Sequence, residues 1–287
     1  MEYIIFVKTK YSNQKLKMIV SGNIRKMRSH LLDEVQYRLP LYDNLEPAEE
    51  LEMNALVGKN IAIRYDGLIN CVVTGKKIKK AYGEGMCYDA FRSSPLAVES
   101  IIRPELSQAH LGIGLRDLAW EQEHHVKPHF VYLSLTSGVK VGVTRDTQIP
   151  TRWIDQGAVK AIILAETPYR QAAGLIEVAL KEYVADKTNW RNMLKNNVGE
   201  ADLVEEKESL GVLIPEELQD FYYEDDTVTE INYPVLQYPE KVSSMKLDKF
   251  PLIEKKLVGI KGQYLMFEDN TVMNLRSHAG YRITIEY

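Results

Sequence analysis

The chain has 287 residues, of which 45% are hydrophobic, and a formal net charge of -4 at pH 7. A chain of this length and composition can bury a large core, which excludes disorder as its main state. Its two cysteines are too few for a disulfide framework, and its sequence has no apolar run of about eighteen residues. We therefore expect a soluble, cytoplasmic protein with one large domain or two ordinary ones and no membrane partner.

Charge is spread unevenly along the chain. Acidic residues crowd 202–230, whereas basic residues dominate 76–80 and the first thirty positions. Those first basic residues are Lys8, Lys10, Lys15, Lys17, Arg25, Lys26 and Arg28. Basic N-terminal strands could bind the phosphates of nucleic acid. The alternative, an ordinary solvated surface, remains open.

Residues 1–70 are expected to form a β-rich N-terminal region. Within it, the alternating segment GKNIAIRYDGLINCVV predicts a hairpin that turns at Asp66-Gly67. Residues 71–126 contain many turn signals and predict an irregular connector. A glycine, strand, acidic turn and strand occur near residue 60 and again near residue 265, either as related hairpins of one sheet or small barrel or by chance.

Residues 127–197 predict a compact module in the order β-β-α-β-α. Two strands, HFVYLSLT and VKVGVT, are followed by a helix near 149–156, the strand KAIILAE and a long helix to about residue 185. Thr167 is the expected N-cap and Pro168 the first residue of that helix. Residues 198–231 predict an acidic linker or a surface helix, and 232–287 a β-rich region that packs on the N-terminal strands. The expected fold class is α+β.

The module carries a tyrosine, Tyr132, on its first strand and a glycine, Gly142, on its second. Here the sequence resembles the GIY-YIG nuclease superfamily, in which such a glycine lets the backbone pass close to the phosphate. That resemblance implies that Arg152 and Glu177 complete the site. Across its whole length the chain resembles an uncharacterised bacterial family, domain of unknown function 2797, through the segments KVGVTRDTQIPTRWIDQGA and DKTNWRNMLKN.

The resemblance implies a role in phosphodiester hydrolysis for each of these side chains. Tyr132 would act as general base or orient the attacking water, which requires a nearby positive charge, from Lys140 or a metal, to lower its pKa. Arg152 would hold the phosphate through its planar guanidinium. Glu177 would bind Mg²⁺ or Mn²⁺, which prefer oxygen ligands.

The module departs from the superfamily pattern. Phe130-Val131 stands in place of Gly-Ile, and Lys140 stands in place of the second tyrosine. Arg145 is a second candidate for the phosphate-binding arginine. Asn189 follows the long helix, where it either supports the phosphate site, as the resemblance implies, or serves as a turn or cap residue.

Structural roles for the same residues remain open. Glu177 shares a helix face with Ala173 and Leu180, so it would be an acid in an apolar stripe that needs a cation nearby. That cation could be a metal, or it could be Arg152 or Arg145 in a buried ion pair. Tyr132 could be an ordinary core tyrosine of a strand.

The two cysteines lie in the segments CVVTGKK and CYDAF, each similar to half of a zinc knuckle. Thr74 and Ala90 occupy the positions of the second cysteines, which leaves two thiolates where structural zinc needs four ligands. Zinc is therefore not expected, and ordinary packing should hold this region.

Three functions follow from these features. The first is a metal-dependent endonuclease, and the second is a nucleic-acid-binding module that does not cut. The third is a structural or protein-interaction domain whose acidic stretch at 202–230 docks a basic partner.

Overall fold

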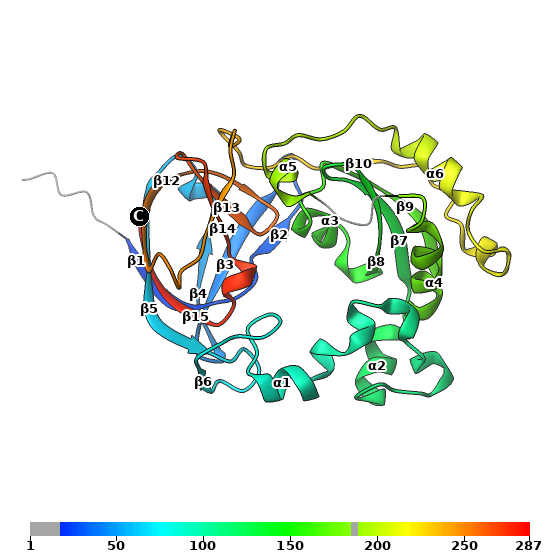
Figure 1. Cartoon of the computed structure of the whole chain (residues 1–287), viewed down its shortest axis with the longest axis horizontal. Coiled ribbons are helices and arrows are strands. Elements are labelled where there is room, and N and C mark those ends of the chain that lie inside the picture. The colour runs from blue at the N-terminus through cyan, green and yellow to red at the C-terminus, as the bar shows by residue number, and fades with distance from the viewer. Residues whose placement is uncertain (1–17, 185–188) are drawn as a thin grey trace, which may run out of the picture.

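A computed structural model describes residues 18–184 and 189–287 of the chain, so Lys8, Lys10, Lys15 and Lys17 lie outside the described residues. The described part combines two sheets with short helices, which confirms the α+β class. Figure 1 shows the large sheet curling round on one side of the molecule and the small sheet standing opposite, between helices. In the part of the chain that is described, no helix is long and apolar enough to cross a membrane.

The large sheet has eleven strands from both ends of the chain. These strands are β1 Ile19–Ile24, β2 Arg28–His30, β3 Gln36–Asp43, β4 Glu46–Glu52, β5 Asn60–Asn70, β6 Lys77–Ile78, β11 Ser243–Met245, β12 Leu252–Lys261, β13 Tyr264–Phe267, β14 Thr271–Asn274 and β15 Tyr281–Glu286. Strand β15 pairs with both β1 and β5, and β12 pairs with β5. The C-terminal strands therefore complete the N-terminal sheet, around one hydrophobic core.

The predicted hairpin at Asp66-Gly67 is wrong, because β5 is a single strand of eleven residues that continues through both of them. Gly67 adopts a φ of +75°, and the pairing of β5 with β15 shifts register between Tyr281 and Ile283. The left-handed glycine thus makes a bulge that bends the strand without reversing it. An acidic turn followed by a strand does occur near residue 265, between β13 and β14.

The small sheet has the strand order β10-β9-β7-β8. Its strands are β7 His129–Leu135, β8 Val139–Arg145, β9 Lys160–Thr167 and β10 Thr229–Glu230, and the helices around it are α3 Thr151–Asp155, α4 Arg170–Leu180, α5 Trp190–Leu194 and α6 Leu203–Gly211. Alternate residues of β7 divide between two cores. Val131 and Leu133 pack with α4 and α6, whereas Tyr132 packs with α3 and the large sheet.

The long helix α4 begins later than predicted, at Arg170, and Tyr169 is its N-cap. The expected cap, Thr167, is wrong because this residue is still part of β9, where its hydroxyl donates to the carbonyls of His129 and Tyr169. Thr167 lies two residues before the N-cap, and its hydroxyl donates to these two carbonyls, so it does not cap the helix. The helix ends at Leu180, before the expected residue 185.

Residues 71–126 contain two short helices, α1 Tyr88–Ser93 and α2 Leu118–His125, and four single 3-10 turns between 95 and 111. The turn Pro104–Leu106 packs on α4, where Gly174 leaves room for the backbone of Glu105. Figure 1 shows this connector running from the large sheet to the lower end of the small one. In the acidic stretch, α6 packs its buried face on the small sheet.

Candidate functional site

Tyr132 lies at the centre of the site, directly opposite Gly142 on the neighbouring strand. Its phenol lies over that glycine, because a Cβ added to Gly142 would meet the phenol oxygen at 2.6 Å. A glycine is therefore required for the ring to lie across β8. The side chain of Tyr132 is completely buried, and its ring contacts Trp153 edge-on at 6.1 Å.

Helix α3 supplies the polar partners of this phenol. The Tyr132 hydroxyl donates a hydrogen bond to Oε1 of Gln156, the residue that ends α3, at 3.0 Å. Burial raises the pKa of Tyr132 above 10, while the charge and hydrogen bonding of Arg152 and the bond to Gln156 act in the opposite direction. Tyr132 and Arg152, predicted from the sequence to share a site, are therefore neighbours, and Gln156 is a member that the sequence reasoning missed.

Glu177 comes from α4, on the other face of the sheet, yet its charge is felt by the Tyr132 phenol. Its side chain is 12% exposed, and its Oε2 lies 3.4 Å from Nζ of Lys181, one turn later. Burial raises the pKa of Glu177, and Lys181 and Arg170 act against this rise. The cation beside the acid is thus Lys181, where the sequence suggested Arg152, Arg145 or a metal.

Arg170, the first residue of α4, is a second member of the site that the sequence reasoning missed. Its guanidinium donates to the carbonyls of Ser100 at 2.7 Å and Ile101 at 2.9 Å. Burial lowers its pKa to about 10, and the charges of Arg152 and Arg145 act in the same direction. Arg152 and Arg145 therefore lie within electrostatic range of Arg170, and Arg170 lies within range of Glu177. Such a group of guanidiniums is typical of anion binding.

Two further predicted residues have different positions. Lys140 lies opposite Ser134 on β8, two residues before Gly142 and on the same face of the sheet. Asn189 is the N-cap of α5, where its side chain accepts hydrogen bonds from the amides of Arg191 and Asn192 at 3.2 Å each. The cap role that the sequence left open for Asn189 is thus the one its hydrogen bonds fill.

A layer of buried histidines lies beneath the arginines. Nδ1 of His129 is 2.8 Å from the carbonyl of Lys127, and its Nε2 is buried without a hydrogen-bond partner among the described residues. His125 Nδ1 lies 3.0 Å from the Ser107 hydroxyl. Burial lowers the pKa of His129 to about 3 and that of His125 to about 4, so both rings are neutral at pH 7.

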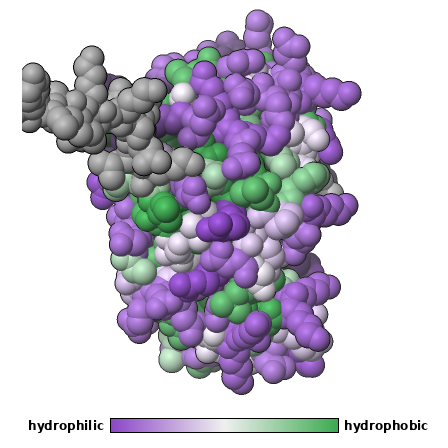
Figure 2. Space-filling model, turned by 90° about the vertical axis from the view of Figure 1, so that its left-hand side faces the viewer, coloured by the Kyte–Doolittle hydropathy of each residue, from purple (hydrophilic) through white to green (hydrophobic). Residues whose placement is uncertain are grey.

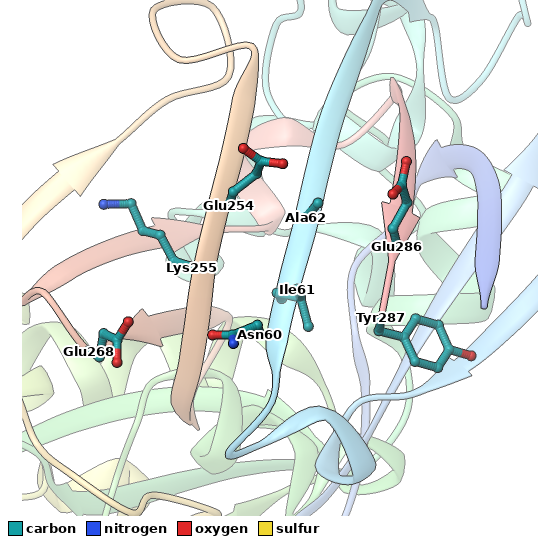
Figure 3. A pocket seen from close by; sticks show the side chains of 8 residues that line it. All are labelled: Asn60, Ile61, Ala62, Glu254, Lys255, Glu268, Glu286 and Tyr287. Carbon is teal, nitrogen blue, oxygen red and sulfur yellow. The ribbon is translucent and has the colours of Figure 1, made fainter. Parts of the chain in front are cut away.

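The wall of the large sheet has the opposite charge. A hollow of about 290 Å³ lies on it, and Figure 3 shows Glu254 and Glu286 flanking the small side chain of Ala62. All three lie in one register row of β12, β5 and β15. Figure 2 shows this side of the molecule as a mainly hydrophilic surface with small, separate apolar patches. Carboxylates in this hollow would repel phosphate.

The described basic residues among the first thirty positions are engaged within the protein. Lys26 forms an ion pair with the buried carboxylate of Asp155, and Arg28 pairs with Glu50 at 2.9 Å. Arg25 lies over the ring of Tyr42, 4.5 Å from its centroid. These partners already neutralise or hold the charges that the sequence suggested for gripping nucleic acid.

Across residues 18–184 and 189–287, no group of three or more His, Cys, Asp or Glu side chains is arranged to hold a metal ion. A hard cation bound through few protein ligands would use Glu177, with phosphate oxygens and water as its other ligands. Glu105 is the second carboxylate near this position, since its charge helps to raise the pKa of Glu177.

Comparison with known proteins gives one match. A family model described as Protein of unknown function (DUF2797) matches residues 58–283. No curated protein and no solved structure matches the chain. The matched residues include the whole small sheet and its helices, most of the large sheet and both cysteines.

Proposed function

The chain belongs to the DUF2797 family, whose description assigns no function. From the site, we propose that the protein acts on nucleic-acid phosphodiesters as a GIY-YIG-like, metal-dependent nuclease. The observation that supports this proposal is that the Tyr132 phenol lies beside Arg152 and within electrostatic range of Glu177. These three residues come from three different elements, and the phenol senses both charges. A phenol, a guanidinium and a carboxylate around one point are the groups that phosphodiester hydrolysis requires.

The arginines would bind the substrate. Arg152 stands beside the phenol, and Arg145 and Arg170 lie near enough for their charges to interact. Guanidinium groups bind two phosphate oxygens at once and stabilise the negative charge that develops during hydrolysis. The carbonyls of Ser100 and Ile101 fix Arg170 in place, so the third arginine would position the backbone of the substrate.

Tyr132 would orient the attacking water. Gln156 accepts the phenolic hydrogen and Arg152 also hydrogen-bonds to the phenol, so these two side chains would fix the direction in which Tyr132 meets the water. Lys140, on the same face of the sheet, would add positive charge beside the phosphate.

The donor set fits a divalent cation at Glu177. This carboxylate is largely buried, has a raised pKa and is balanced by the flexible side chain of Lys181, which can move aside. A hard cation accepts oxygen ligands of this kind. When bound, Mg²⁺ or Mn²⁺ would supply Lewis-acid stabilisation of the phosphate.

A second function, nucleic-acid binding without cleavage, is favoured by the burial of Tyr132. The side chain is 0% exposed, and burial raises its pKa, which opposes loss of the phenolic proton at neutral pH. The three arginines would retain their phosphate contacts in that case.

Cleavage assays separate the two functions. Purified protein is incubated with supercoiled, linear and branched DNA and with structured RNA, with Mg²⁺ or Mn²⁺. We expect cleavage by the wild type, at least a hundredfold loss in Glu177→Gln and a smaller loss in Tyr132→Phe. Glu217→Gln is the matched control, because this carboxylate is exposed in the 3-10 helix Glu216–Phe221, which follows α6. Binding without cleavage by the wild type would select the second function, and the absence of both would reject the site.

A further inference from the structure

Cys71 and Cys87 lie together at the junction of the large sheet and the connector. Cys71 follows the last residue of β5, and Cys87 is the N-cap of α1. The amide of Cys87 donates to Sγ of Cys71 at 3.1 Å, and both thiols are free. Two cysteines sixteen positions apart in the sequence are therefore neighbours in the fold.

Thr74 contacts both sulfurs. Its amide lies 3.4 Å from Sγ of Cys71, and its hydroxyl oxygen lies 3.9 Å from Sγ of Cys87. Sγ of Cys87 also accepts the amide of Ala90 at 3.5 Å. Hydrogen bonds from amides stabilise thiolate over thiol, so the surroundings of Cys71 favour its reactive form.

The backbone around the pair is fixed. The amide of Val72 donates to the carbonyl of Gly85 at 3.0 Å, which ties the two cysteine segments together. Gly85 has a φ of +94° and abuts the carbonyl of Ala279, in the turn before β15. Backbone contacts thus hold the two cysteine segments next to each other.

The two thiols differ in access. Cys71 is completely buried, whereas Cys87 is partly exposed. Burial alone would raise the pKa of Cys71, but hydrogen bonds from Thr74 and Cys87 outweigh it and lower the pKa to about 7. An oxidant can therefore reach Cys87 first, and the buried sulfur of Cys71 lies beside it.

We propose that Cys71 and Cys87 form a peroxide-reactive dithiol that closes to a disulfide in the folded protein. The Cys87 thiolate attacks one oxygen of the peroxide, the O–O bond breaks, hydroxide leaves and Cys87 becomes a sulfenic acid. The Cys71 thiolate then attacks the Cys87 sulfur, the S–O bond breaks and a second hydroxide leaves. In sum, two thiols lose two electrons and two protons, and one peroxide becomes two waters.

Thiol counting on the full-length wild-type protein tests this proposal without a variant. The reduced protein should show two reactive thiols under denaturing conditions, and stoichiometric hydrogen peroxide should reduce the count to zero. Peptide mapping should then show Cys71 and Cys87 in one linked pair, which a reducing agent releases. The proposal is overturned if both thiols persist, if the link joins two chains, or if the purified protein holds zinc that prevents the reaction.

Two single variants assign the order of the steps. In Cys71→Ser, Cys87 should stop at a sulfenic acid that a cyclic dione traps. In Cys87→Ser, the peroxide reaction should slow at least tenfold, because the remaining sulfur is buried. An equal rate in both variants would contradict the assigned order. In the wild type, disulfide closure should raise the melting temperature by roughly 5 °C, since it closes a loop in the unfolded chain.

Discussion

The two sheets of this protein differ in how their charged side chains are arranged. On the large sheet, charged side chains lie on an outer wall and pair with one another across strands, as Arg38 does with Glu52 and Arg28 with Glu50. At the small sheet, Arg145, Arg152 and Arg170 converge from a strand and two helices. Two acids, Glu177 and Glu105, accompany these three cations.

The difference shows where an anion can bind. Paired charges on the large sheet are satisfied and exposed, so they add little to stability or to recognition. Charges at the small sheet are partly buried and lie close to like charges, a cost that a bound phosphate would relieve. The substrate is therefore expected at the small sheet, although the sequence also suggested the N-terminal strands.

The largest expected contrast comes from one glycine in each sheet. Gly142→Ala places a Cβ 2.6 Å from the buried Tyr132 phenol and should lower the free energy of unfolding by about 3 kcal/mol. In Gly67→Ala the new Cβ meets no atom within 4 Å, and only the φ of +75° is unfavourable for alanine. The free energy of unfolding is therefore expected to fall by about 1 kcal/mol. Urea unfolding of both variants gives the comparison. A larger loss in Gly67→Ala would show that the site tolerates a side chain on β8.

The buried histidines give the second contrast. Folding lowers the pKa of His129 to about 3 and of His125 to about 4, from about 6.5 in the unfolded chain. Their neutral forms stabilise the fold fully above pH 6.5, and this contribution is lost as the pH falls toward 4. Each of the two rings should lower the free energy of unfolding by about 2.5 kcal/mol between pH 7 and pH 4.5.

The matched variant for this pH dependence is His129→Asn, whose side-chain amide can still donate to the Lys127 carbonyl. Its stability should vary less with pH than that of the wild type. If the stability of His129→Asn depends on pH as steeply as that of the wild type, protonation of His129 is not the cause of the pH dependence.

The smallest effect concerns binding. Arg152→Ala should weaken binding of a nucleic-acid oligonucleotide about tenfold and reduce the salt dependence by about one phosphate contact. Arg28→Ala removes an arginine that already pairs with Glu50 on the large sheet, so less than a twofold change is expected. Fluorescence anisotropy at several salt concentrations measures both variants. Equal losses would place the binding surface across both sheets.

Local sequence patterns predicted the order of strands and helices better than the residues at which they begin and end. The alternation around Tyr132 and Gly142 gave two paired strands, and the chain does fold in the order β-β-α-β-α from β7 to α4. The end of β9 and the start of α4 were misplaced because Thr167 is held by a carbonyl of β7, a contact that its neighbours in the sequence do not reveal. Asp66-Gly67 was misread because a left-handed glycine serves bulges as well as turns.

Sequence alone determined the residue types of the candidate site, the α+β class and the family resemblance, because these depend on local order and composition. Tertiary structure decided that Lys181 is the cation beside Glu177, that Arg170 and Gln156 belong to the site, and that Tyr132 is fully buried. Distances between side chains on different elements depend on how the sheet and helices pack, and no pattern along the chain encodes them.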